Sequence, residues 1–444
     1  MKKIFILISF IYFLQVSAQD TKENYAFSLQ QAIEHSIQYN YSEINSGRDI
    51  EAAKKKKWET TTMGLPQING AVNYQDNFKL QKSLIPAEIF GGTPGTFAEV
   101  EFGTKQNMGA SLTLNQLIFD GSYLVGLQAS KVYLQLFENA KRKTDSEISE
   151  VVTQSYGNVL LAEESIKVLE RNKTILEKNF NDAHQFYKNG LGEQETEEQI
   201  AITLTTVKSS LNNVTRLREI ALKMLKINLG IEINDELTLT DNLESLAQAN
   251  LQKALENSEF NVNNTIDYQI TSNLTEQKRL LVKLEKSKAL PSLSANVNFG
   301  YNAFNSKFNF FNQDQRWFNY SNLGVSLNVP IFSSLGRSAR TQQAKIAFEQ
   351  AKTSQTETEQ KLKLQYEKTK SDFEYSVEEY ASAKNNLNLA ERIEKKQQTK
   401  FTEGLSTSFE LSEAQRQLYA TQQSYLQSMV DVINKRATLE KILK

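Results

Sequence analysis

Strict alternation of apolar and polar residues marks four segments of the chain. Between positions 293 and 302, for example, Leu293 and Ala295 alternate with Ser294 and Asn296. A repeat of two residues predicts β-strands that have one apolar and one polar face. The alternating segments are 67–74, 108–115, 293–302 and 322–331.

A second pattern, in which apolar residues recur at alternating steps of three and four, follows each pair of strands. No proline interrupts residues 95–290, which suits long helices because proline lacks the N–H and clashes with the preceding turn. About 65 residues of helix would measure roughly 100 Å, far more than a globular domain spans. The same apolar pattern resumes beyond Gly190 and Gly404, so each glycine is expected at the tip of a helical hairpin. The heptad positions are Val152, Val159, Ala162, Ile166, Leu169, Leu176, Phe180, Ala183 and Tyr187, then Leu362, Tyr366, Thr369, Phe373, Ser376, Tyr380, Ala383, Leu387 and Ala390.

The same order of elements occurs twice, which indicates a tandem duplication. The matching motifs are Leu65-Pro66 with Leu290-Pro291, Leu114-Asn115 with Leu327-Asn328, and Gly190-Leu191 with Gly404-Leu405. We therefore expect a first repeat over residues 19–230 and a second over 263–444, each with a helix, two strands and a long helical hairpin. Residues 231–262 form the link between them.

The first residues are typical of a secretory signal. Lys2 and Lys3 precede an apolar run, residues 4–14, and a small-residue cleavage site that ends at Ala18. Residues 1–18 are thus predicted to be a signal peptide. A retained membrane anchor is the alternative, although a spanning helix needs about 20 apolar residues. Cleavage would leave Gln19 rather than a cysteine at the new N-terminus, which excludes a bacterial lipid anchor.

The polar face of the predicted strands is small and uncharged, as expected of a barrel lining that faces water. A soluble, half-buried sheet would alternate in the same way. Aromatic residues that flank the apolar face, among them Phe78, Phe308, Trp317, Phe318 and Tyr320, favour a membrane interface. The residues expected to line the lumen are Asn69, Asn73, Thr113, Asn115, Asn296, Asn298, Ser326 and Asn328.

Four strands cannot close into a barrel, and lipid does not tolerate an open sheet edge. Copies of the chain must therefore associate. Since small closed barrels take eight or more strands, two or three chains are needed, and the pattern alone does not choose between them.

Composition and motifs argue against several classes of function. The chain has no cysteine, and its 51 basic residues balance 52 acidic ones, so neither disulfides nor the basic footprint of a nucleic-acid binder is expected. His35 and His184 are the only histidines and have no partners at metal-ligand spacing. No nucleophile elbow or nucleotide loop is present. We expect no enzyme activity, no cofactor and no metal.

The duplicated layout of two strands followed by a long hairpin, with the Leu-Pro and Gly-Leu motifs, resembles the TolC-like outer-membrane efflux protein family over essentially the whole mature chain. The resemblance implies a mainly α fold with a membrane β-barrel portion: a homotrimer that shares a twelve-stranded barrel in the cell outer membrane and extends a helical tunnel into the periplasm. It also implies partnership with a periplasmic adaptor protein and an inner-membrane pump.

The resemblance further assigns two sets of residues. Glu410 and Glu413 match the acidic residues with which family members narrow the periplasmic end of the tunnel; a solvated helix face is the alternative. The hairpin tips Gly190, Leu191, Gly404 and Leu405 match those that dock the adaptor; a simple helix-turn signal is the alternative.

The predicted function is therefore a passive exit duct in a tripartite system that exports small molecules such as drugs. A duct for type I protein secretion and a soluble periplasmic coiled-coil scaffold remain the alternatives.

Overall fold

The computed structural model describes residues 24–253 and 260–443, so the predicted signal peptide, residues 1–18, lies outside the described residues. The chain divides into two compact units, each of which draws on both repeats. The strand unit comprises residues 49–139 and 270–357. The helical unit comprises the described residues of the remaining segments, 24–48, 140–269 and 358–443.

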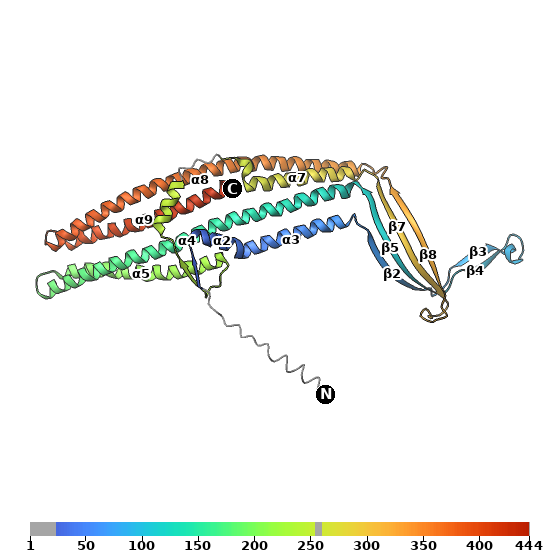
Figure 1. Cartoon of the computed structure of the whole chain (residues 1–444), viewed down its shortest axis with the longest axis horizontal. Coiled ribbons are helices and arrows are strands. Elements are labelled where there is room, and N and C mark those ends of the chain that lie inside the picture. Colours follow the sequence, from blue (N-terminus) through green and yellow to red (C-terminus); the bar gives the residue numbers. More distant parts are fainter. Residues whose placement is uncertain (1–23, 254–259, 444) are drawn as a thin grey trace, which may run out of the picture. The chain divides into compact units, whose positions relative to one another are not determined.

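The strand unit contains an antiparallel sheet with the order β2-β5-β7-β8 (Figure 1). Its strands are β2 (Gln67–Asp76), β5 (Gln106–Asp120), β7 (Ser292–Asn305) and β8 (Trp317–Asn328). β-Branched and aromatic residues on alternate positions favour this pleated conformation. A register shift interrupts the pairing of β5 with β7 between Leu117 and Phe119. β2 and β8 are left as open edges.

Helices lead into and out of these strands. α3 (Tyr41–Thr62) precedes β2, and α7 (Ile266–Ser287) precedes β7. α4 (Gly121–Lys188) and α8 (Gly336–Thr402) begin in the strand unit and continue into the helical unit. Among the described residues, no helix is both long and apolar enough to cross a membrane.

The loop between β2 and β5 forms a small hairpin of its own. β3 (Lys82–Pro86) pairs antiparallel with β4 (Phe97–Glu101), and the 3-10 helix η1 (Ala87–Phe90) lies between them. These strands are too short to show a decisive alternation in the sequence.

The helical unit is built from two hairpins. α4 returns through α5 (Gln194–Leu229), and α8 returns through α9 (Ser408–Leu443). α5 contacts α9. Polar pairs also join the hairpins, because Asn172 Nδ2 donates to Gln422 Oε1 at 2.9 Å and Asn179 Nδ2 donates to Gln398 Oε1 at 3.1 Å. The apolar core between them contains Val152, Tyr156, Val159, Leu225, Leu229, Val430, Val432 and Ile433.

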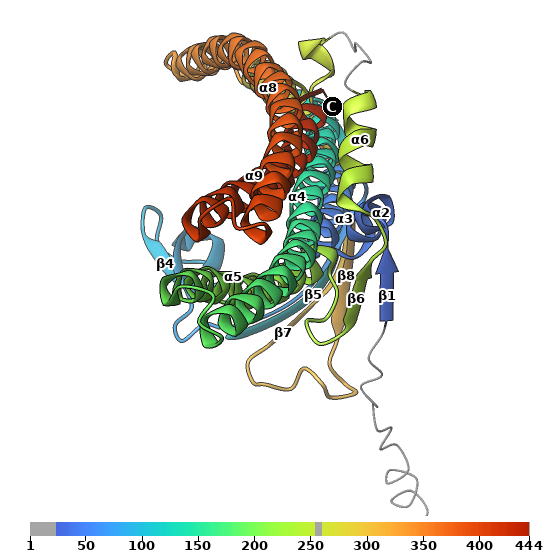
Figure 2. The ribbon, with the colours of Figure 1, turned by 90° about the vertical axis from the view of Figure 1, so that its left-hand side faces the viewer.

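Short elements complete this unit. β1 (Asn24–Phe27) pairs in parallel with β6 (Glu236–Leu239), as Figure 2 shows. α2 (Leu29–Tyr39), α6 (Leu243–Lys253) and η2 (Val262–Asn264) are the other short helices. β6 and α6 belong to the segment between the repeats, and η2 begins at its last residue.

Tyr156 fixes this segment to α4. Its buried hydroxyl donates to the carbonyl oxygen of Phe27 at 2.9 Å and lies 3.1 Å from Asp241 Oδ2. The same carboxylate oxygen accepts from the backbone N–H of Leu29 at 2.6 Å, at the start of α2. Burial raises the pKa of the Tyr156 hydroxyl, so it remains a donor at neutral pH.

Candidate channel lining, gate and hairpin tips

A row of hydrogen bonds crosses the polar face of the sheet. Thr113 Oγ1 donates to Asn298 Oδ1 at 2.8 Å, and Asn298 Nδ2 donates to Asn322 Oδ1 at 3.0 Å. Asn69, the register partner of Thr113, extends this row onto β2. Because directly paired residues point to the same face of a sheet, these side chains form one polar surface.

Two glycines make room for the asparagines of this surface. A Cβ on Gly109 would lie 2.8 Å from Asn302 Oδ1, and a Cβ on Gly324 would lie 2.6 Å from Asn296 Oδ1. Real Cβ atoms do not approach so closely, so a larger residue at either position would displace the amide. Pairing of glycine with asparagine across the strands therefore lets uncharged amides lie flat against this face.

The eight residues predicted to line the lumen all fall on this face by register. Asn73 lies opposite Gly109, and Asn115 lies opposite Asn296. Ser326 and Asn328 lie opposite Ser294 and Ser292. Sequence reasoning omitted Asn302 and Asn322 from the set, although the period of two places both on the same face. Their exposure to a water-filled lumen stays a prediction.

The opposite face of the sheet is apolar and exposed. One register row joins Ile68, Leu114, Val297 and Leu323, of which Ile68, Val297 and Leu323 are exposed. No described element covers this row within the strand unit. An aliphatic surface of this extent on a sheet is typical of contact with lipid or with another protein.

Aromatic residues cluster at one end of the apolar face. The ring of Tyr74 lies 5.4 Å from that of Phe308 and 6.0 Å from that of buried Phe310. Trp317 shares this face, because it pairs with Ala303, which pairs with Met108 opposite Tyr74. The expected aromatic flank is therefore present.

The assignment of Phe318 and Tyr320 to that flank is wrong. Their register partners are Asn302 and Gly300, so both lie on the polar face. The alternation of faces along β8 begins at its first, aromatic residues, so Phe318 and Tyr320 lie on the same face as Asn322. Gly300 accommodates the neighbouring ring, since a Cβ there would lie 2.7 Å from the ring of Tyr320.

The two hairpin tips have the same turn. Gly190 has φ +69° and Gly404 has φ +71°. The N–H of Leu191 donates to the carbonyl oxygen of Phe186 at 2.9 Å, and that of Leu405 donates to Lys400 at 2.8 Å. This is the Schellman motif, in which a left-handed glycine ends the helix. Leu191 and Leu405 both remain exposed beside the turn.

The gate candidates Glu410 and Glu413 lie in the first turns of α9 and are exposed. The Glu410 carboxylate accepts from Ser406 Oγ at 2.7 Å and from the backbone N–H of Thr407 at 3.0 Å. Thr407 Oγ1 in turn accepts from the N–H of Glu410 at 3.2 Å, which completes a capping box. Glu413 forms an ion pair with Arg416 one turn later.

These contacts bias the charge of the gate candidates. Hydrogen bonds, first from Ser406 and then from Thr407, lower the pKa of the Glu410 carboxyl. Repulsion among three carboxylates in a ring would raise that pKa, so the effect within one chain has the opposite sign. Arg416, which sequence reasoning missed, offsets the charge of Glu413; its spacing of three residues was the available signal.

Contacts near the tips join the two hairpins. Ser408 Oγ donates to Gln199 Oε1 at 2.9 Å, and the hydroxyl oxygens of Thr203 and Ser412 lie 3.2 Å apart. The first turns of α5 and α9 therefore pack side by side. Gln199, which matches Glu413 in the first repeat, supplies a neutral partner rather than a second carboxylate.

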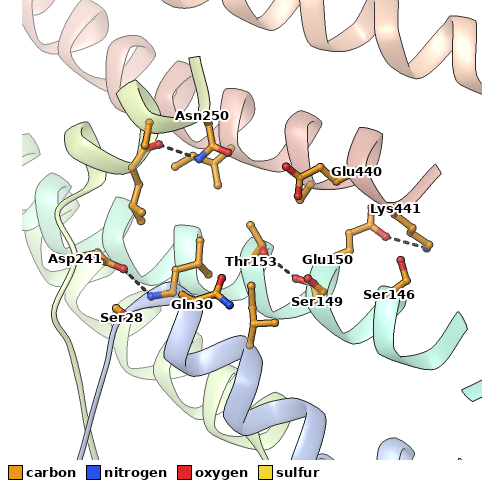
Figure 3. A pocket seen from close by; sticks show the side chains of 16 residues that line it. Ser28, Gln30, Ser146, Ser149, Glu150, Thr153, Asp241, Asn250, Glu440 and Lys441 are labelled. Atoms are coloured by element: carbon orange, nitrogen blue, oxygen red, sulfur yellow. Dashed lines mark hydrogen bonds and ion pairs between the residues drawn. The ribbon is translucent and has the colours of Figure 1, made fainter. Parts of the chain in front are cut away.

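A cavity of about 280 Å³ lies among α2, α4, α6 and α9 (Figure 3). Polar groups around it are hydrogen-bonded within the protein. Glu150 accepts from Thr438 at 2.7 Å and from Lys441 at 2.9 Å, and Thr153 donates to the carbonyl oxygen of Ser149. We interpret it as a junction between helices. Within the part of the chain that the structure describes, no cluster of histidine, aspartate or glutamate is arranged to hold a metal ion.

Comparison with known proteins agrees with this geometry. Residues 275–443 match the family model of outer membrane efflux proteins. The chain is similar to the solved structure of CusC, a protein described as forming a transmembrane channel, with TM-score 0.74, 16% identity and coverage of 94% of this chain and 92% of that one. No protein in the curated set matches the sequence.

Two further structures are similar. The outer membrane protein VceC of Vibrio cholerae gives TM-score 0.71 at 14% identity, covering 94% of this chain and 95% of its own. The MtrE outer membrane channel of Neisseria gonorrhoeae gives 0.72 at 14% identity, covering 94% and 88%. The predicted resemblance to the TolC-like outer-membrane efflux protein family is thus confirmed, by the family model over residues 275–443 and by the outer-membrane channel fold over 94% of the chain.

Proposed function

We propose that the protein is the outer-membrane exit duct of a tripartite efflux system for small molecules. The observation that carries the proposal is the sheet of the strand unit: a neutral, hydrogen-bonded polar face, an exposed apolar face and two open edges. This combination fits a portion of a barrel wall between water and lipid.

Edge chemistry supports association between copies of the chain, and the family resemblance makes a homotrimer the proposed number. β2 and β8 each leave a row of backbone N–H and C=O groups without partners within the sheet, at a cost of several kcal/mol per group in lipid. Pairing of β2 with β8 of the next copy removes both edges. Three copies then contribute twelve strands, within the range of known outer-membrane barrels.

The lumen would discriminate little between the solutes that pass through it. Its lining, from Asn69 across Thr113 and Asn298 to Asn322, presents amides and hydroxyls that already bond to one another. Such a surface favours passive flow of hydrated solutes. Selection and energy would come from an inner-membrane pump.

The tips suit docking of a periplasmic adaptor. Leu191 and Leu405 stand exposed on identical, conformationally fixed turns, so both repeats would present the same apolar contact. Replacement of either leucine by serine is expected to weaken adaptor binding while leaving the turn itself unchanged, since the turn depends on the glycines.

The gate can be tested by charge removal. Three copies of Glu410 and Glu413 around an axis would attract multivalent cations, so Glu410→Gln with Glu413→Gln is expected to weaken their block and to make conductance more variable. Glu195→Gln on the first hairpin is the matched control. Block that is unchanged by the double substitution would remove the ring assignment.

The function itself is tested by reconstituting the detergent-extracted protein into planar lipid bilayers. Stepwise conductance is expected, with any ion preference coming from the candidate gate rather than from the neutral lumen, and Asn298→Asp should shift the preference further toward cations. A protein that inserts no pores, and that fractionates with soluble periplasmic proteins, would instead be a coiled-coil scaffold.

A further inference from the structure

The loop that joins β2 to β5 contains the ordered β3–β4 hairpin. Figure 1 shows the hairpin projecting beyond the ends of β2 and β5. Two strands alone are marginally stable in water. Other contacts must therefore stabilise the hairpin, and several lie at its far end.

Hydrogen bonds order the far end of the hairpin. The Glu88 carboxylate accepts from the backbone N–H of Gly95 at 3.0 Å, and the N–H of Ala87 donates to the carbonyl oxygen of Thr96 at 2.9 Å. Gly91 and Gly95 take φ values of +78° and +83°, which other residues rarely adopt. The turn is thus held in one conformation by charged and backbone groups.

This ordered turn presents apolar side chains to the outside. Ile89, Phe90 and Phe97, which we name the apolar knob, are 71%, 63% and 64% exposed. Below the knob, Lys82 and Glu99 form an ion pair at 2.9 Å across the strands. A polar stem therefore carries a preorganised hydrophobic end, an arrangement that favours binding because little conformational entropy is lost.

Charge and position indicate what covers the knob. Residues 77–105 carry three lysines and three glutamates, so the hairpin has no net charge to draw it to an anionic surface or to repel a second copy. β2, from which the hairpin leaves, is an open edge of the sheet. In the proposed assembly that edge adjoins the next copy.

We propose that the apolar knob binds the knobs of neighbouring copies, so that the hairpins converge over the outer mouth of the duct. The inference rests on the proposed function, because the shared barrel holds the copies together. Held in one assembly, the knobs face one another at high effective concentration, so a small apolar contact suffices. Convergence would narrow the outer mouth.

A single cysteine tests this contact, since the chain has no cysteine of its own. In the assembly extracted with detergent, Phe90→Cys should form a disulfide-linked pair of chains under mild oxidation, because a disulfide needs Cβ atoms about 4 Å apart. Lys79→Cys, at the base of the hairpin, is the matched control and should not cross-link. The native mass should be unchanged by oxidation.

The apolar character of the contact is tested by adding Ile89→Ser and Phe97→Ser to Phe90→Cys. We expect the cross-linked band to be lost while the native mass stays that of the assembly. A band that survives both serines would overturn the proposal, as would a native mass that doubles on oxidation, which would place the contact between assemblies.

Two other results are informative. An assembled protein in which Phe90→Cys does not cross-link, and in which a fluorophore on that cysteine is quenched by brominated lipid, would overturn the proposal in favour of a membrane contact while leaving the duct in place. Extraction as single chains would overturn both the knob contact and the proposed function.

Discussion

The two units use the same aliphatic residues in opposite ways. In the helical unit, Val152 and Leu225 are 0% exposed, whereas Val72 and Leu323 on the sheet are each 71% exposed. Both patterns are regular, so the difference reflects the surroundings that each surface meets. Helical side chains find partners within the chain. The sheet face is left for the hydrocarbon of a membrane, as the proposed duct requires.

The largest expected effect compares two leucines directly. Leu225→Ala removes a fully buried side chain from the helical core and should lower the free energy of unfolding by about 2–5 kcal/mol. Leu323→Ala, on the exposed face, should change it little. Thermal unfolding of the extracted protein followed by helical circular dichroism provides the measurement. Equal losses would mean that the sheet face is buried in a protein core.

A charge on the sheet separates its two faces. Leu323→Arg should disfavour membrane insertion by about 2–4 kcal/mol, because it places a cation in lipid. Asn322→Arg, the next residue, points to the polar face and should insert normally. The amount of each variant recovered from the outer-membrane fraction decides between them. If both variants insert equally, the assignment of faces to lipid and water is wrong.

Loss of the Tyr156 hydroxyl tests how the inter-repeat segment is held to α4. Tyr156→Phe leaves Phe27 and Asp241 without this partner and should cost about 1–3 kcal/mol, since a buried acceptor loses its hydrogen bond. Denaturant unfolding measures the change. Tyr366→Phe, on α8, is the control, and an equal loss there would show a general packing effect.

The smallest effect concerns the tip of the second hairpin. Thr407→Ala removes the cap of α9 and should cost about 1 kcal/mol, seen as faster hydrogen exchange in the first turn of that helix. The lowered pKa of Glu410 adds a pH dependence. Its stabilisation is complete above the ordinary glutamate pKa of about 4.3 and is lost as the pH falls through the lowered value.

Glu410→Gln should abolish that pH dependence, because no carboxylate remains to titrate. Glu403→Gln, in the tip but outside the capping box, is the control and should preserve it. Persistence of the dependence in Glu410→Gln would mean that another group titrates at the tip.

Local periodicity predicted most of the fold. The alternation in 293–302 placed Asn296 and Asn298 on one face, and the register of β7 with β8 agrees. Gly190 and Gly404 were expected at the hairpin tips, and both take the left-handed conformation there. These features depend on spacing along the chain, which the sequence displays directly.

Other features depend on contacts between distant residues. The parallel pairing of Asn24–Phe27 with Glu236–Leu239 joins segments that share no pattern. The heptad stripe also placed Tyr187 in the helical contact, yet its side chain is 42% exposed near the tip, where its hydroxyl reaches Gln194, the first residue of the return helix. The ion pair of Glu413 with Arg416 changes the charge of the candidate gate; the three-residue spacing is compatible with such a pair, and the side-chain geometry shows that it forms.

The native mass of the protein extracted by detergent from the outer-membrane fraction tests the central claim most directly. The open edges of β2 and β8 require copies of the chain to associate, and the proposed twelve-stranded barrel predicts an assembly of three chains that survives in detergent. A monomer or dimer recovered in the soluble periplasmic fraction would contradict the shared barrel and, with it, the proposed duct.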